Sequence, residues 1–221
     1  MSGPKWKGVF ATGCFAFALL APAAHADAIF SIDTNTSSIT GQSGYMDFAF
    51  SYYDGAAGAI ATITAFSSDA TLGGCSAGCL TGDVSGELPG TVVVSNGAPA
   101  GPIDDLYEEP VIWGTYIEFV VTLSGPGLST SGETASSTFA LTYYDSLYDP
   151  LLSADASGAS AMLTVEPDQS VSTETFADTN GGFDTTLAAN SPAPEPSSWL
   201  LFGCGLLGAG LAGRRWRRLA A

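Results

Sequence analysis

Short runs in which large apolar side chains recur at every second residue constrain the fold of this chain more than any other feature. Such a period places alternate side chains on opposite faces of an extended strand, one face buried and the other open to solvent. The alternating runs contain Met46, Phe48, Phe50 and Tyr52; Ile117, Phe119, Val121 and Leu123; Phe139, Leu141 and Tyr143; and Ala161, Leu163 and Val165. Residues 60–66 and 91–95 are further strand candidates.

Turn motifs rich in Gly, Pro, Asn and Asp separate these runs, as in Asp54-Gly55 and Asn96-Gly97. About seven to ten short strands over residues 27–190 predict an all-β domain, an antiparallel β-sandwich with jelly-roll-like connections. The clustered aromatic residues argue against a disordered chain. We find no convincing amphipathic helix in this region.

The distribution of charge limits the chemistry open to this domain. The formal net charge is -16, and all 22 acidic residues fall between Asp27 and Glu195, where there is no Lys, Arg or His. The single histidine is His25. The six basic residues all lie near the two ends of the chain: Lys5, Lys7, Arg214, Arg215, Arg217 and Arg218.

Several function classes are excluded by this absence of basic side chains. Without histidine or lysine there is no Ser-His-Asp or Cys-His catalysis, no imidazole metal ligand and no Schiff base. Without cations there is no groove for a nucleic-acid backbone and no clamp for phosphates. Binding of Ca²⁺ by carboxylates and glycoside hydrolysis by a carboxylate pair remain open, although no motif selects such a pair.

Residues 1–26 have the three-part pattern of a secretory signal peptide. Lys5 and Lys7 precede an apolar run at residues 9–22, and Ala24-His25-Ala26 provides small residues for cleavage. The apolar run has about 14 residues, fewer than the roughly 20 that span a bilayer as a helix. We therefore expect cleavage after Ala26 in preference to an N-terminal membrane anchor.

The other end of the chain predicts a second membrane-directed segment. A Pro-rich linker at residues 191–198 precedes an apolar run at residues 199–213 and a basic tail at residues 214–221. As a transmembrane helix, the run covers only about 21 Å and needs a thinned bilayer. The four arginines place the C-terminus on the cytoplasmic side and the central domain outside.

Pro194-Glu195-Pro196, the short Leu- and Gly-rich helix and the final arginine cluster together resemble the PEP-CTERM sorting signal of Gram-negative bacteria. The resemblance implies recognition by exosortase, a membrane transpeptidase that cleaves near Pro-Glu-Pro. It also implies transient anchoring in the inner membrane, passage to the cell surface or medium, and a link to exopolysaccharide production. A GPI signal is the alternative, but its tail is not expected to end in arginines.

Residues 44–50, 82–90 and 137–145 are similar to a set of exported bacterial proteins with the same sorting tail. That similarity implies a β-rich extracellular domain and supplies no catalytic residues. Cys75 and Cys79 are the only cysteine pair of the mature domain, and in an oxidising compartment we expect a disulfide. A CxxxC redox role is the alternative, whereas zinc lacks further thiol or imidazole ligands.

Two acidic stretches are candidate sites. The first contains Asp104, Asp105, Glu108 and Glu109, and the second runs from Tyr143-Tyr144-Asp145 to Tyr148-Asp149. We expect both to be solvated loops, with one helical turn available to residues 103–109. The alternatives are a Ca²⁺ site in the first stretch, or a surface whose tyrosines stack on sugar rings.

These observations favour a non-enzymatic surface or matrix protein that works through adhesion or association with polysaccharide. We expect no cofactor other than Ca²⁺ and no catalytic residues. A Ca²⁺-dependent carbohydrate-binding module and a glycoside hydrolase with two carboxylates are the alternatives.

Overall fold

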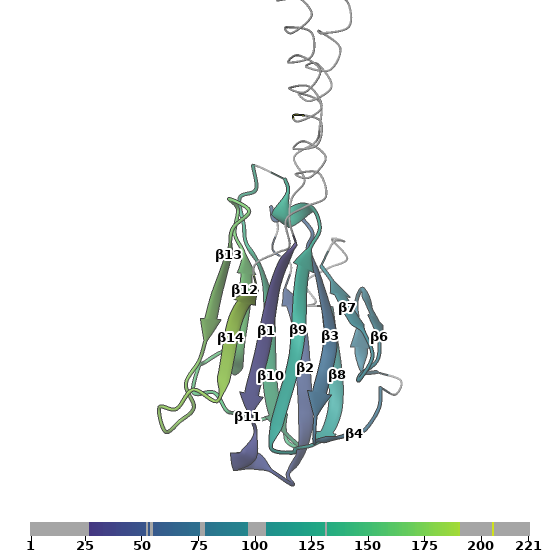
Figure 1. The fold of residues 1–221 in the computed structure, drawn as a ribbon, viewed down its shortest axis with the longest axis vertical. Coiled ribbons are helices and arrows are strands. Elements are labelled where there is room, and N and C mark those ends of the chain that lie inside the picture. Colours follow the sequence, from purple (N-terminus) through teal and green to yellow (C-terminus); the bar gives the residue numbers. More distant parts are fainter. Residues whose placement is uncertain are drawn as a thin grey trace, which may run out of the picture. The chain divides into compact units, whose positions relative to one another are not determined.

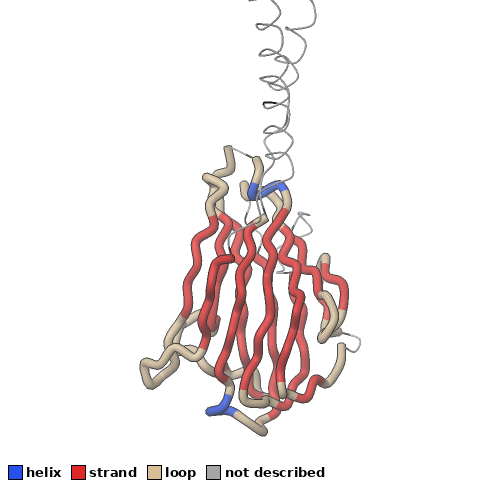
Figure 2. The backbone as a smooth tube through the Cα atoms, in the orientation of Figure 1, coloured by secondary structure: helices blue, strands red, loops and turns tan. Residues whose placement is uncertain are grey.

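The computed structural model describes residues 27–51, 53, 55–75, 78–96, 105–130, 132–190 and Gly205. Strands dominate the unit from Asp27 to Pro192, with short 3₁₀ helices at η1 (Ser37–Ile39) and η2 (Pro126–Leu128) (Figure 2). The predicted signal peptide, the Pro-Glu-Pro motif and the basic tail lie outside the described residues, as does the membrane helix apart from Gly205. Within the described stretches, no helix is long and apolar enough to span a membrane.

The strands form two antiparallel sheets that lie one in front of the other in Figure 1. The front sheet has six strands in the order β14-β1-β9-β3-β7-β6. The first and last of the described strands, β1 and β14, are therefore neighbours. The bounds are β1 (Ala28–Asn35), β3 (Ile60–Ser68), β6 (Val84–Gly86), β7 (Val92–Ser95), β9 (Tyr116–Ser124) and β14 (Thr185–Asn190).

The back sheet has the order β13-β12-β10-β2-β8-β4, with two short strands, β11 paired to β10 and β5 paired to β8. Among the described strands, the chain changes sheet at each step from β1 to β4, from β5 to β6, at each step from β7 to β10, and from β13 to β14. The bounds are β2 (Ser43–Ser51), β4 (Thr71–Leu72), β5 (Leu80–Thr81), β8 (Asp105–Ile112), β10 (Ser137–Asp145), β11 (Pro150–Leu151), β12 (Ala159–Val165) and β13 (Val171–Thr175).

The core lies between the two sheets and is built from the alternating residues that the sequence predicts to be buried. The Phe48 ring of the back sheet packs edge-on against the Phe119 ring of the front sheet, with ring centroids 5.2 Å apart. Each such side chain contributes about 1.5–3 kcal/mol when fully buried. The predicted inward residues are confirmed at Met46, Phe48, Phe50, Ile117, Phe119, Val121, Leu123, Phe139, Leu141, Tyr143, Ala161, Leu163 and Val165. The expected antiparallel sandwich is thus confirmed.

The acidic stretch around residue 105 differs from its prediction. We expected a solvated loop or one helical turn, but residues 105–112 form strand β8, paired with β2 along its length. Asp105, Tyr107 and Glu109 point inward from β8, where apolar residues would be expected. Backbone and side-chain hydrogen bonds satisfy these inward polar groups, so a strand can bury them without an apolar signature.

Candidate ligand-binding surface

The outer face of the back sheet gathers three tyrosines at one end. Met46 and Phe48 of β2 point into the core, so Tyr45 points outward. The strand register places Tyr45 opposite Tyr144 of β10 on one side and opposite Pro110 of β8 on the other. We refer to Tyr45, Tyr144 and Tyr148 as the tyrosine cluster.

Tyr148 reaches this face from the turn that follows β10. Its ring stacks on that of Tyr45, with centroids 4.6 Å apart and planes 6° apart, and lies 6.0 Å from the Tyr144 ring. Tyr148 is still 50% exposed, so a ring remains accessible to a ligand. Its backbone has a φ of 64°, a left-handed conformation that costs a non-glycine residue about 1–3 kcal/mol.

The Asp145 carboxylate holds this turn in place. Asp145 Oδ1 accepts hydrogen bonds from the backbone N–H groups of Leu147 at 2.7 Å and Asp149 at 2.9 Å. The Tyr148 N–H donates to the Asp145 carbonyl at 3.1 Å. This local network offsets the backbone cost at Tyr148 and fixes the position of its ring.

Two carboxylates lie beside the tyrosine cluster. Asp47 of β2 is directly opposite Glu108 of β8 in the strand register, and both point outward. The Tyr148 hydroxyl donates to Glu108 Oε1 at 3.2 Å. Asp47 is only 9% exposed, and its Oδ1 has no hydrogen-bond partner among the described residues. Burial and the negative charge of Glu108 raise the pKa of Asp47 to about 7.

A shallow depression of about 250 Å³ adjoins Tyr45 on the same face. Pro110 and Ile112 of β8 line it, together with Ser43, Thr71 and Ser146. Ligand sites usually occupy about 300–1,000 Å³, so the depression alone suits a small group or one unit of a longer ligand. Aromatic, apolar and hydroxyl-bearing residues thus meet along one continuous surface.

The structure divides the second acidic stretch of the sequence between surface and core. Tyr144 and Tyr148 join the tyrosine cluster as the sugar-stacking alternative requires. Tyr143, however, is fully buried, and its hydroxyl donates to Thr34 Oγ1 at 2.7 Å. Burial raises the pKa of Tyr143, and the residue is not available to a ligand. The reason is the alternation of β10, which turns neighbouring tyrosines to opposite faces.

The first acidic stretch is divided in the same way. Glu108 points outward, whereas Asp105 and Glu109 point inward, and Asp104 lies outside the described residues. Asp105 Oδ1 accepts a hydrogen bond from the Asp83 N–H at 2.6 Å. The part of the chain that the structure describes contains no group of three or more His, Cys, Asp or Glu residues placed to hold a metal ion. Calcium binding by this stretch stays a prediction.

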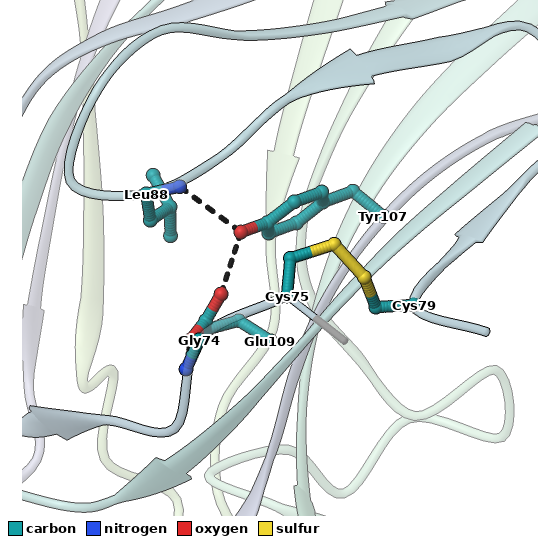
Figure 3. The surroundings of a disulfide bond; sticks show 6 residues. All are labelled: Gly74, Cys75, Cys79, Leu88, Tyr107 and Glu109. Carbon is teal, nitrogen blue, oxygen red and sulfur yellow. Dashed lines mark hydrogen bonds between the residues drawn. A yellow bond between two sulfur atoms is a disulfide. The ribbon is translucent and has the colours of Figure 1, made fainter. Parts of the chain in front are cut away.

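Glu109 has a structural role beside the disulfide, shown in Figure 3. The buried Glu109 carboxylate accepts hydrogen bonds from the Tyr107 hydroxyl at 2.5 Å and the Gly74 N–H at 2.9 Å. The Tyr107 oxygen in turn accepts from the Leu88 N–H at 3.0 Å, and burial raises the pKa of Tyr107. These bonds tie two loops to the inner face of β8.

The predicted disulfide between Cys75 and Cys79 is present, with Cα atoms 5.6 Å apart. It closes the loop that begins at Gly74, which Glu109 anchors. Cys79 is buried, and its carbonyl accepts a hydrogen bond from the Glu108 N–H at 2.8 Å. This hydrogen bond connects the disulfide loop to β8, the strand that carries Glu108 and Glu109.

Sequence reasoning missed Tyr45 and Asp47 as site residues. The alternation of β2 indicates that both point away from the core, and this signal is present in the sequence. The sequence does not indicate that Tyr45 and Asp47 lie beside Tyr144 and Glu108. These residues meet only because β2 pairs with β10 and β8, which come from distant parts of the chain.

Comparison with known proteins gives one finding. Residues 192–218 match the family model of the PEP-CTERM protein-sorting motif. The match includes Pro194, Glu195, Pro196 and the arginine cluster, and confirms the sorting signal that the sequence predicts. The motif indicates an exported protein that exosortase processes and that has a C-terminal membrane anchor before processing. No curated protein and no solved structure matches the chain.

Proposed function

We propose that the sandwich is a non-catalytic binding domain that attaches this exported protein to a cell-surface or matrix polysaccharide. The observation that carries the proposal is the stacked pair of Tyr45 and Tyr148, half-exposed at Tyr148 and adjoining the depression on the outer face of the back sheet. The sorting motif supports it, because an exported protein meets such polymers.

The chemistry of the surface suits a sugar. Tyrosine presents an apolar ring face together with a hydroxyl, and the apolar C–H face of a pyranose packs against such rings. Carboxylates accept hydrogen bonds from sugar hydroxyls, and the serine and threonine side chains of the depression can donate or accept them. One turn of chain fixes Tyr148 before any ligand arrives, which lowers the entropy lost on binding.

Replacing either stacked tyrosine tests this function. We expect Tyr148→Ala and Tyr45→Ala to weaken polysaccharide binding by about tenfold, since each removes about 1–1.5 kcal/mol of ring contact. The measurement is affinity electrophoresis of the exported protein in gels containing extracellular polysaccharide from the producing cells. Phe183→Ala is the matched control, because Phe183 is 63% exposed and lies outside the tyrosine cluster.

Three results would contradict the proposal: no retardation of the wild-type protein, an equal effect of Phe183→Ala, or release of reducing ends from the polymer. The last would indicate hydrolysis in place of binding. Removal of Ca²⁺ with a chelator distinguishes the proposed function from a Ca²⁺-dependent binding module. We expect polysaccharide binding through the tyrosines to persist without Ca²⁺, whereas binding by a Ca²⁺-dependent module would be lost.

The sorting signal makes a separate prediction about the mature protein. We expect the surface form to end near Pro194-Glu195-Pro196, without the arginine cluster, and a Glu195→Ala variant to accumulate in the membrane fraction. Mass spectrometry of the C-terminal peptide measures both. A surface form that is intact to Ala221 would exclude cleavage of this motif.

A further inference from the structure

Building on the proposed function, we propose that Asp47 and Glu108 recognise a protonated amine, so that the polysaccharide bound by this surface carries free amino sugars. The two carboxylates face each other across β2 and β8 on the outer face of the back sheet. Carboxyl groups paired in this way repel each other unless a donor or a positive charge lies between them.

The state of Asp47 is the first argument for a ligand. Its Oδ1 is buried and unpartnered among the described residues, although a buried carboxylate oxygen normally accepts at least one hydrogen bond. Leaving a charged acceptor unsatisfied costs more than about 1–3 kcal/mol. A donor that meets the Asp47 carboxylate as its side chain turns toward the surface would recover this cost.

The second argument is that no described residue donates a hydrogen bond to Asp47 Oδ1 and that the domain carries no positive charge to place beside the pair. The strand register places Glu108 and Thr142 on either side of Asp47, and Tyr144 is a near neighbour whose pKa is raised by burial and by the Asp47 charge. The nearby Tyr148 hydroxyl already donates to Glu108. No Lys, Arg or His lies between Asp27 and Glu195, so no side chain of the domain can bring a positive charge to the pair.

An ammonium group fits this arrangement better than the other charged ligands. It offers three donors to two carboxyl groups, and its positive charge favours the ionised form of Asp47 beside Glu108. Calcium would require about six to eight oxygen ligands, and only two carboxylates meet here. A polymer of uronic acids would be repelled by a protein with a formal net charge of -16.

The tyrosine cluster supplies the reason to assign the amine to a sugar. Tyr148 both stacks on Tyr45 and contacts Glu108 through its hydroxyl, so a ring bound at the aromatic face lies next to the carboxylate pair. An amino substituent on that ring can therefore reach the carboxylates while the ring itself contacts tyrosine. Lysine side chains lack such a ring and would use the carboxylates alone.

The test compares three ligands by calorimetry with the exported protein: a glucosamine oligomer, the N-acetylglucosamine oligomer of the same length, and an oligolysine of similar charge. We expect the glucosamine oligomer to bind at least about tenfold more tightly than the acetylated one, because a charge-assisted hydrogen bond contributes about 1.5–3 kcal/mol. The double variant Asp47→Asn/Glu108→Gln should lose this preference and still bind the acetylated oligomer through the tyrosines.

A matched control is available on the opposite sheet. Asp33 and Glu118 are also directly opposite each other, across β1 and β9, but both are exposed. The double variant Asp33→Asn/Glu118→Gln removes the same charge and should keep the preference for the amine. An equal loss in both double variants would show general attraction to a negative protein and overturn the inference.

The other outcomes are also decisive. Equal binding of the two sugar oligomers by the wild-type protein overturns the amine site. Tighter binding of oligolysine than of the glucosamine oligomer would show that the amine recognised is not that of a sugar. Loss of the preference for the glucosamine oligomer after addition of a chelator would show that the carboxylates bind a metal ion and not an amine. The proposed function fails separately, if the acetylated oligomer binds Tyr148→Ala as tightly as wild type.

Discussion

At the scale of the single residue, Asp47 is the clearest conflict between stability and binding in the sandwich. Burial and the charge of Glu108 raise its pKa from an ordinary value of 3.8 to about 7. The groups that face it are Glu108, Thr142 and Tyr144, none of which carries a positive charge. A residue that destabilises the fold in this way persists most simply when a ligand uses it.

The raised pKa of Asp47 has a defined effect on stability. Between pH of about 4 and about 7, Asp47 holds a proton in the folded state that it has lost in the unfolded state. The free energy of unfolding therefore falls as pH rises through this range. Above pH 7 it stays at the lower value, because Asp47 is then ionised in both states. At pH 8 we expect Asp47→Asn to stabilise the protein by a few kcal/mol, because a pKa difference of one between the folded and unfolded states corresponds to about 1.4 kcal/mol. At pH 4 we expect little stabilisation, since Asp47 is then protonated in the folded state.

Urea denaturation of wild type and Asp47→Asn at these two pH values measures the difference. Asp33→Asn, which removes one negative charge at an exposed position, serves as the control for net charge. A stabilisation by Asp47→Asn that is the same at pH 4 and pH 8 would show that ionisation of Asp47 is not its source.

At the scale of the element, the sequence predicts strands whose inner face is apolar and misses those whose inner face is polar. Strands β2, β9, β10 and β12 follow directly from alternation. Strand β8 does not, because Asp105 and Glu109 occupy inward positions and their hydrogen-bond donors come from residues 74–83 and from Tyr107. Strand β13, at the edge of the sheet, has mostly exposed polar side chains and no period to detect.

Only part of the binding surface can be predicted from the sequence, because some of its residues are neighbours in the chain and others meet only through strand pairing. Tyr144 and Tyr148 belong to an aromatic and acidic stretch that stands out in the sequence. Asp47 and Glu108 become neighbours only when β2 pairs with β8, and that pairing depends on the register of the whole back sheet. Local pattern therefore indicates which way each side chain points, while the topology decides which side chains meet.

The polar interior of β8 makes a prediction about stability. Tyr107→Phe leaves the buried Leu88 N–H without its acceptor and Glu109 without one of its donors, so we expect a loss of about 2–4 kcal/mol in the free energy of unfolding. Tyr148→Phe, which removes a hydroxyl from an exposed hydrogen bond, should cost less than about 1 kcal/mol. Chemical denaturation of both variants checks this, and equal losses would refute a special role for the Tyr107 hydroxyl.

At the scale of the whole molecule, the sandwich is a polyanion without internal counter-charge. All acidic residues except Glu195 belong to residues 27–190, and no basic side chain is available there to form an ion pair. The repulsion among them opposes the compact state and keeps separate molecules apart. An exported protein with this charge can approach neutral or cationic polymers and is repelled by acidic ones, which agrees with the ligand proposed for the tyrosine cluster.

This repulsion predicts that salt stabilises the fold. Raising NaCl from about 10 mM to about 1 M shortens the screening length from about 30 Å to about 3 Å, so the melting temperature should rise steadily over this range. Calcium and magnesium chloride, compared at equal ionic strength, should act alike if screening is the cause. A much larger rise with calcium would instead indicate a specific site, and a melting temperature that is insensitive to all three salts would show that the carboxylates are too far apart to destabilise the sandwich.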